Sequence, residues 1–277
     1  MTGKTAHTAK TVLICGASGG LGQVLARTLQ GKGMVVCGTM RDPSKAIATD
    51  FPMLPMNVTD EQSVAECLSS AREKMGSVDV VVNCVNEMVL GSVEETSMGE
   101  LDRVYAINVL GLAAIAKAAV PVMRDQGHGL IVTMSSLGGV LAVPYLSAYT
   151  SSKFALEAFS EALYHEVKPD NIDVAIMQPV AMHMDRPDVG DHLKIAEGAG
   201  SNSMTQSVAR LMAKDTRASK LTPEKVSLAI HDVIVSKKRK LRYPMDRARV
   251  VGKIKRVAPQ AMINKLIGGM LNDARRA

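Results

Sequence analysis

Three side chains near the middle of the chain are of types that move a proton on or off an alcohol oxygen: Ser136, Tyr149 and Lys153. Tyr149 and Lys153 are four residues apart, so on a helix they share one face. An ammonium held near a phenol favours the phenolate and so lowers the phenol pKa. Together with a hydroxyl, these groups form an acid/base set for a carbonyl or an alcohol. The alternative interpretation is an interface tyrosine and a solvated lysine.

The residues around these three side chains predict the elements that position them. Residues 130–134 form an apolar strand, a Ser/Gly/Pro loop follows, and a helix then continues to about Val167. Ser136 therefore lies at the carboxyl end of a strand, where the binding sites of open α/β sheets gather.

A glycine-rich loop near the start of the chain predicts a phosphate site. A short apolar strand over residues 10–15 runs into Gly16, Gly20 and Gly22, and an amphipathic helix follows. Glycine lets the backbone turn tightly and approach a pyrophosphate, which then faces the helix N-terminus. Strand, glycine loop and helix in this order favour dinucleotide binding over a plain tight turn.

The end of the second predicted strand, residues 34–39, indicates which dinucleotide is bound. In such folds the residue after this strand reaches the adenosine ribose, and an arginine there accommodates a 2′-phosphate. Arg41 therefore favours NADP(H) over NAD(H), with Ser18 as a second phosphate contact. Asp42 keeps NAD(H) open, and a solvated arginine is the remaining alternative.

The rest of the pattern predicts an α/β fold with a doubly wound parallel sheet. Further strands are expected at 53–58, 78–82, 172–177 and 240–243, and helices at 60–75, 98–123 and 222–235. The fully apolar run at 78–82 is typical of a strand in a buried parallel sheet. Residues 180–221 lack strand periodicity, and a loop this long is usually functional. We expect it to be a substrate lid.

Composition favours one large catalytic domain, residues 1–245, followed by a basic amphipathic helical tail, residues 246–277. The net charge is +6, and residues 237–256 alone carry ten Lys or Arg and one acidic residue. Because the basicity is concentrated near the C-terminal end of the sequence and not in the catalytic body, a nucleic-acid-binding fold is not expected. Peripheral contact with an anionic membrane is one interpretation of the tail; a solvated face and a helix covering the substrate cleft are the others.

Four cysteines without C-x-x-C spacing and six histidines without ligand spacing predict no metal site. Buried, reduced thiols suit a cytoplasmic protein. The first ten residues contain no apolar segment of the kind that marks secretion.

With these pieces in order, the sequence resembles the short-chain dehydrogenase/reductase family over roughly residues 10–245. The resemblance is carried by the glycine motif, by Asn83 after the fourth strand, by Asn108, and by the Ser136, Tyr149 and Lys153 set. It implies a Rossmann-type single domain. Residues 39–42, the Arg242-Tyr-Pro segment and the basic tail are most similar to hydroxysteroid and retinol dehydrogenases.

The resemblance also implies a role for each site residue. Tyr149 would be the acid/base, and Lys153 would lower its pKa and bind the nicotinamide ribose. Ser136 would hydrogen-bond the substrate oxygen, and Asn108 would hold the helix carbonyl and the water that connect Lys153 to solvent. The implied activity is NADP(H)-dependent interconversion of a secondary alcohol and a ketone on an apolar substrate that is steroid-, retinoid- or polyketide-like. A homodimer or homotetramer is also implied.

Two sets of contacts are expected on this basis. The cofactor set is Gly16, Ser18, Gly19, Gly20, Leu21, Gly22, Arg41, Asn57, Val58, Asn83, Val85, Tyr149, Lys153, Pro179 and Met182. The substrate set is Ser136, Leu137, Tyr145, Tyr149, Val180 and Met184.

The sequence departs from the family pattern at three places, and the altered loops at Val85 and Val180 motivate an alternative function, against which the intact Ser136, Tyr149 and Lys153 argue. The family's Asn-Asn-Ala-Gly is Asn-Cys-Val-Asn at residues 83–86, its Asp before the strand-three valine is Asn57, and the glycine and threonine expected after Pro179 are Val180 and Met184. The alternative is a catalytically weak or inactive NADP(H)-sensing regulator or scaffold on the same fold.

Overall fold

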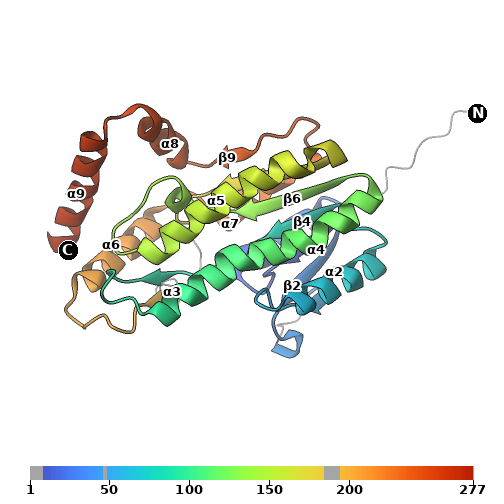
Figure 1. The fold of residues 1–277 in the computed structure, drawn as a ribbon, viewed down its shortest axis with the longest axis horizontal. Helices are drawn as coiled ribbons and strands as arrows, with labels where there is room; N and C mark the ends of the chain where they lie inside the picture. Colours follow the sequence, from blue (N-terminus) through green and yellow to red (C-terminus); the bar gives the residue numbers. More distant parts are fainter. Residues whose placement is uncertain (1–8, 46–48, 184–193, 277) are drawn as a thin grey trace, which may run out of the picture.

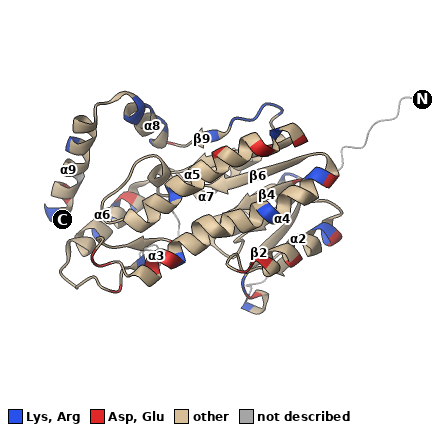
Figure 2. Cartoon of the chain, in the orientation of Figure 1, with Lys and Arg blue, Asp and Glu red and all other residues tan. Residues whose placement is uncertain are grey.

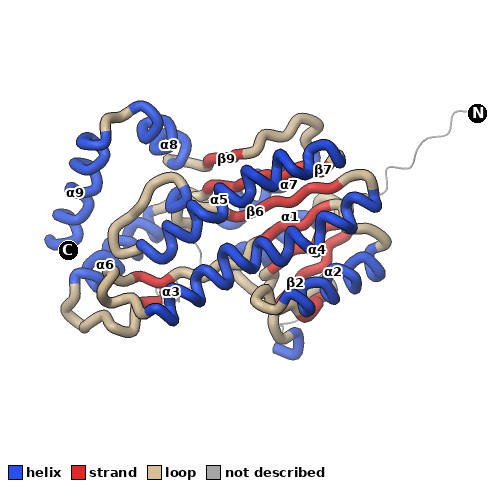
Figure 3. Tube along the Cα trace, viewed as in Figure 1, coloured by secondary structure: helices blue, strands red, loops and turns tan. Residues whose placement is uncertain are grey.

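The chain folds around a seven-stranded parallel sheet in the order β3-β2-β1-β4-β6-β7-β9 (Figures 1 and 3). This computed structural model describes residues 9–45, 49–183 and 194–276. The strands are β1 (Thr11–Cys15), β2 (Val35–Met40), β3 (Met53–Pro55), β4 (Val80–Asn83), β6 (Gly129–Met134), β7 (Ile172–Gln178) and β9 (Arg242–Pro244). The central strands β1, β4 and β6 are buried along their whole length, as their continuous apolar sequence predicts.

Helices cover both faces of the sheet, which makes the fold doubly wound. α1 (Gly20–Gly31) and α7 (Pro223–Val235) pack on one face, and α2 (Glu61–Met75), α4 (Gly111–Gln126) and α5 (Ser147–Val167) pack on the other (Figure 1). Each layer has its own apolar core cluster against the sheet. The expected Rossmann-type architecture is confirmed.

The long helix expected at 98–123 is divided into three parts. α3 (Met98–Tyr105) continues through a π-helical segment, η2 (Ala106–Leu110), into α4. By length and composition Met98–Gln126 would also suit a membrane span, but α4 packs against α2 and the sheet as a core helix. A π-turn inside a helix is frequent at functional sites, and this one contains Asn108.

The expectation of an irregular segment over 180–221 is wrong for two parts of it, residues 194–195 and 204–218. α6 (Met204–Ala218) is a regular helix, and β8 (Lys194–Ile195) pairs with β5 (Val89–Leu90) in a small second sheet. The buried Glu100 carboxylate accepts a hydrogen bond from the Glu197 backbone N–H, which ties this segment to the start of α3. Helical periodicity in 204–218 was the signal that sequence reasoning missed.

The tail forms two helices, as expected. α8 (Ala248–Val257) and α9 (Gln260–Arg276) follow β9, and α9 returns to pack on α6 (Figure 1). We call residues 246–276 the C-terminal arm.

Candidate active site

The glycine loop is built to bring backbone close to backbone. Gly16 has a φ of +83°, a conformation that favours glycine. A Cβ on Gly22 would lie 2.5 Å from the Gly16 carbonyl oxygen, so no side chain fits there. Ser18 and Gly19 are exposed, while Gly20 and Leu21 in the first turn of α1 are half-buried.

The start of α1 has no side-chain cap and no acidic residue in its first turn. Its first N–H groups have no partner within the helix, and the helix dipole makes this end positive. Thr39 in β2 holds the loop from the other side, since its hydroxyl accepts from the Gly16 N–H and its carbonyl from the Ala17 N–H. The residues present therefore fit the pyrophosphate of a dinucleotide.

Arg41 and Asp42, which sequence reasoning left in competition, differ in the structure. Arg41 is exposed directly after β2. The Asp42 carboxylate instead accepts hydrogen bonds from the Ser44 N–H and hydroxyl and pairs with Lys45. These bonds hold the pKa of Asp42 below its usual value, chiefly through the Ser44 hydroxyl. Asp42 is thus engaged locally, and Arg41 is the more available of the two.

Ser136, Tyr149 and Lys153 are brought together at the carboxyl edge of the sheet. Ser136 follows β6 and caps the short helix η3 (Leu137–Gly139), where its Oγ accepts from the Gly138 N–H. Tyr149 and Lys153 lie on α5, and the Lys153 Nζ is 5.6 Å from the centre of the Tyr149 ring. Lys153 is only 1% exposed, and its Nζ donates to the Met134 carbonyl at 2.8 Å. A buried ammonium directed at the end of a strand is not a solvated lysine.

The electrostatics of this group differ from the expectation in one respect. Burial raises the Tyr149 pKa, and the hydrogen bond with Ser136 lowers it only in part. The predicted net lowering of the Tyr149 pKa is therefore wrong for this structure, because burial dominates and the Lys153 ammonium is bonded to a backbone carbonyl. Burial also lowers the pKa of Lys153 to about 7, while Glu157 and Cys84 act to raise it.

Glu157, which sequence reasoning did not select, faces Lys153 from one turn further along α5. It is buried, and its carboxylate accepts from the Gln178 side chain on β7 at 2.9 Å and from the Arg242 Nε on β9 at 2.8 Å. Arg242 also pairs with Glu161 at the exposed edge. The spacing of Lys153 and Glu157 by four residues was the only local signal, since Gln178 and Arg242 are distant in sequence.

Asn108 projects from the π-turn and fixes the loop after β4. Its Oδ1 accepts from the Glu87 N–H, and its Nδ2 donates to the Glu87 carbonyl at 2.8 Å and to the Ser152 Oγ at 2.9 Å. Glu87 itself pairs with Arg103 and Lys194. Asn108 therefore joins the loop to the helix of Tyr149, and the expected water bridge to Lys153 stays a prediction.

The departures after β4 change the shape of the cofactor edge. The Asn83 Oδ1 accepts a hydrogen bond from the Val85 N–H. Val85 packs partly against the core, and its Cγ2 lies so close to Gly16 that a Cβ on Gly16 would be 3.2 Å from it. Asn86, which stands where the family has a glycine, does not adopt a left-handed conformation. The Oδ1 of Asn57, a predicted cofactor contact, already accepts hydrogen bonds from the Thr59 N–H and hydroxyl. Val58 is buried against Gly111.

The substrate side is apolar. One cluster joins Tyr149 and Tyr145 to residues of α6, the β4–α3 loop and α9; its partly buried members include Met88, Val143, Met204, Leu211 and Met212. Tyr145 has a φ of +65°, which is strained for an aromatic residue, and its carbonyl accepts from the Gly91 N–H. A held, strained aromatic beside Tyr149 is consistent with the predicted substrate contact.

The remaining predicted contacts, near Pro179, differ in how far their side chains are exposed. The Leu137 N–H donates to the Pro179 carbonyl, which joins the loops after β6 and β7, and Met182 is half-buried against the core. Val180 is 5% exposed and belongs to the core cluster under α7, so little of its side chain is left to meet a substrate. Met184 lies outside the described residues.

Comparisons with known proteins agree with this geometry. The family model for the short chain dehydrogenases matches residues 10–187. A 3-ketodihydrosphingosine reductase of Bacteroides thetaiotaomicron is 38% identical over 168 residues, 61% of this chain and 62% of the relative. The mouse 3-ketodihydrosphingosine reductase is 30% identical over 182 residues, 61% of this chain and 55% of the relative.

These curated relatives are longer than the part that matches, so the chain spans about six tenths of their length. Among solved structures, a short-chain dehydrogenase from Streptomyces avermitilis is 27% identical, with a TM-score of 0.81 over 94% of this chain and 96% of that one. With the glycine loop, the π-turn asparagine and the Ser136, Tyr149 and Lys153 set in place, the chain belongs to the short-chain dehydrogenase family.

Proposed function

We propose that this protein is an NADP(H)-dependent oxidoreductase that interconverts a ketone and a secondary alcohol on a long apolar substrate. The observation that carries the proposal is the buried Lys153 ammonium beside Tyr149 and Ser136, at the sheet edge where the glycine loop also opens. Burying a lysine without a function would be costly, because a charge loses its hydration there.

Each residue has a task in the reduction direction. Ser136 hydrogen-bonds the carbonyl oxygen of the substrate and orients it toward Tyr149. The Tyr149 hydroxyl gives its proton to that oxygen as negative charge develops there. Once the proton has left, the nearby Lys153 ammonium favours the phenolate, an effect smaller than the burial that raises the Tyr149 pKa. Glu157 in turn favours the charged form of Lys153. When bound, the nicotinamide supplies the hydride that the carbonyl carbon accepts.

The apolar cluster around Tyr145 and Tyr149 supports a lipophilic substrate. Its methionines, Met88, Met204 and Met212, have flexible side chains that adapt to irregular apolar shapes. Since relatives are named as 3-ketodihydrosphingosine reductases, a long-chain ketone with a polar head is the first substrate to test. A steroid and a retinoid are the next.

Cofactor choice follows from the exposed Arg41 and the engaged Asp42. We expect NADPH to bind more tightly than NADH, and Arg41→Ala to weaken NADPH by about tenfold while leaving NADH nearly unchanged, since a cation near a 2′-phosphate contributes about 1.5–3 kcal/mol. Fluorescence titration of both cofactors measures this. Equal loss for both cofactors would contradict a role for Arg41 at the phosphate.

The reaction itself is tested by NADPH oxidation with 3-ketodihydrosphingosine and a panel of apolar ketones. Turnover that disappears in Tyr149→Phe supports the proposal. Tight NADPH binding with no turnover of any ketone, and no difference between wild type and Tyr149→Phe, would instead favour the NADP(H)-sensing regulator.

A further inference from the structure

The C-terminal arm places apolar side chains on the side of α8 that faces away from the body. The side toward the body consists of Ala248, Gly252 and Lys255, spaced as one helix face. Ala248 is buried, a Cβ on Gly252 would lie 3.7 Å from Val140, and the Lys255 Nζ donates to the Val140 carbonyl. Lys255 also lies 4.6 Å above the Phe154 ring on α5. α8 is therefore anchored through small residues and a lysine.

The opposite side of α8 is occupied by valines. Val250 is 57% exposed and Val257 is 85% exposed, and the half-buried Ile254 lies between them on the helix surface. On α9, Met262 and Leu266 are also more than half exposed. A helix of a globular protein normally turns its apolar stripe to the core. Here that stripe is turned outward.

Cations border this apolar face. Arg249, Lys253 and Arg256 on α8 and Lys265 on α9 are all exposed. The arm has eight basic and two acidic residues, a net charge of +6 that equals the net charge of the whole chain. Figure 2 shows basic segments on α8 and in the loop that precedes β9. On α8 the three cations thus lie along one side of the apolar stripe.

We propose that this outer face of the arm docks on the surface of an anionic lipid bilayer. Apolar side chains would enter the boundary between headgroups and acyl chains, and the flanking lysines and arginines would pair with lipid phosphates. A second copy of the chain fits less well, because two arms of +6 would repel each other in a symmetric contact. Nucleic acid would match the cations but not the exposed valines, and the arm has no aromatic residue to stack on a base.

The position of the arm gives this docking a consequence for the substrate, which rests on the proposed function. The Lys255 Nζ donates to the Val140 carbonyl in the loop that follows Ser136. Ala274 of α9 lies in the apolar cluster that contains Tyr149. A bilayer on the outer face would therefore lie next to the substrate side of the protein. A lipophilic ketone partitions into such a bilayer.

The test is co-sedimentation of the purified full chain with vesicles of phosphatidylcholine alone and of phosphatidylcholine with phosphatidylglycerol. We expect binding only to the anionic vesicles, weakened by salt. Val250→Asn with Val257→Asn should weaken it by about tenfold or more, since each valine leaves an apolar site. Lys253→Gln with Arg256→Gln should weaken it by about fivefold per cation.

Val235→Asn is the matched control, because Val235 is 55% exposed at the end of α7 and lies outside the arm. It should bind as wild type does, and circular dichroism should show that all variants are folded. The proposal is overturned by no binding to anionic vesicles, by equal loss in the control, or by a dimer in sedimentation velocity that Val250→Asn with Val257→Asn dissociates without any lipid binding. Vesicle binding does not need turnover, so its failure leaves the proposed reaction untouched.

Discussion

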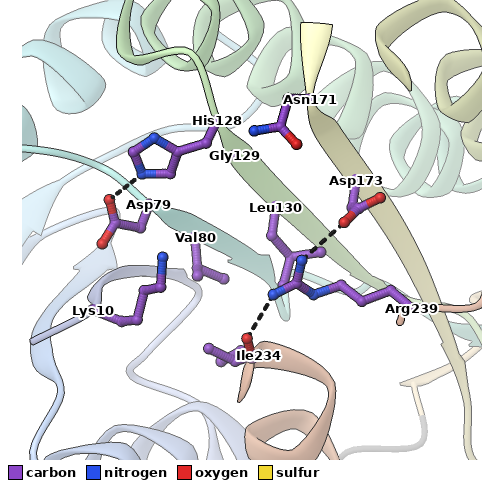
Figure 4. A pocket seen from close by; sticks show the side chains of 10 residues that line it. All are labelled: Lys10, Asp79, Val80, His128, Gly129, Leu130, Asn171, Asp173, Ile234 and Arg239. Atoms are coloured by element: carbon purple, nitrogen blue, oxygen red, sulfur yellow. Dashed lines mark hydrogen bonds and ion pairs between the residues drawn. The ribbon is translucent and has the colours of Figure 1, made fainter. Parts of the chain in front are cut away.

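Both edges of the sheet carry polar and charged side chains, but these are arranged differently. At the amino edge, a small cavity of about 100 Å³ is lined by Asp79, His128, Asp173 and Arg239, which pair with one another (Figure 4). Asp79 bonds to His128 at 3.0 Å and Asp173 to Arg239 at 2.8 Å. At the carboxyl edge, Lys153 is buried with a carbonyl as its hydrogen-bond acceptor and with the Glu157 carboxylate near by.

The pKa directions show what this difference means. Burial acts to raise the pKa of both aspartates. Hydrogen bonds from Thr11 and His128 outweigh it for Asp79, and those from Lys168 and Arg239 outweigh it for Asp173. Both pKa values therefore lie below the usual value. For Lys153 burial prevails, and its pKa falls to about 7. The charges at the amino edge are thus paired and held in their charged forms, whereas burial disfavours the charge of Lys153 at the carboxyl edge, as expected for the proposed proton-transfer site.

The largest effect is expected for Tyr149→Phe, which removes the proton donor and keeps the ring. We expect kcat to fall by about 10² to 10⁴, the usual contribution of a positioned acid/base, with NADPH binding unchanged. Stopped-flow reduction and cofactor titration measure the two quantities. Tyr164→Phe is the matched control on the same helix and should retain full activity. Equal loss in both variants would remove the functional distinction of the carboxyl edge.

Glu157→Gln tests the comparison through an effect on activity of intermediate size. The Glu157 carboxylate raises the pKa of Lys153, so its removal lowers that pKa further. The proposed reaction needs the ammonium, and kcat/KM for reduction should therefore fall as pH rises through about 7. In Glu157→Gln this fall should begin at lower pH. A lowering of about one pKa unit from about 7 would reduce the ammonium fraction at pH 7 from one half to about one tenth, a loss of about fivefold.

Glu161→Gln is the control for that experiment, because Glu161 shares Arg242 with Glu157 but lies at the exposed edge. Its pH profile should match that of wild type. A profile that moves equally in both variants would mean that Arg242, and not the charge facing Lys153, sets the pH dependence.

The smallest effect on activity is expected for Asp173→Asn, which should leave kcat and NADPH binding unchanged. It breaks the pairs with Arg239 and Lys168, and we expect a loss of about 1–2 kcal/mol in the free energy of unfolding, measured by urea denaturation. The pKa of Asp173 is lowered in the folded state. The ionised carboxylate therefore contributes to the free energy of unfolding above the ordinary aspartate pKa, and this contribution is lost as pH falls through the lowered pKa. The variant should therefore lose less stability in acid than wild type. A change in NADPH affinity would show that the two edges are coupled.

Much of the fold was predictable from sequence because its signals are local. Continuous apolar runs predict buried parallel strands, and a glycine loop between a strand and a helix predicts a phosphate site over a few residues. The spacing of Tyr149 and Lys153 places both on one helix face without any knowledge of the rest of the chain. In the same way, Thr222 and Pro223 predict the start of α7.

What only the tertiary structure decided depends on residues far apart in the chain. Glu157 meets Arg242 across 85 positions, and no local pattern shows that the carboxylate acting on Lys153 is held by this arginine. The sign of the Tyr149 pKa shift depends on burial, which the four-residue spacing does not contain. The amphipathicity of α8 was visible in sequence, but only packing of Ala248, Gly252 and Lys255 on the body decided that its valines face outward.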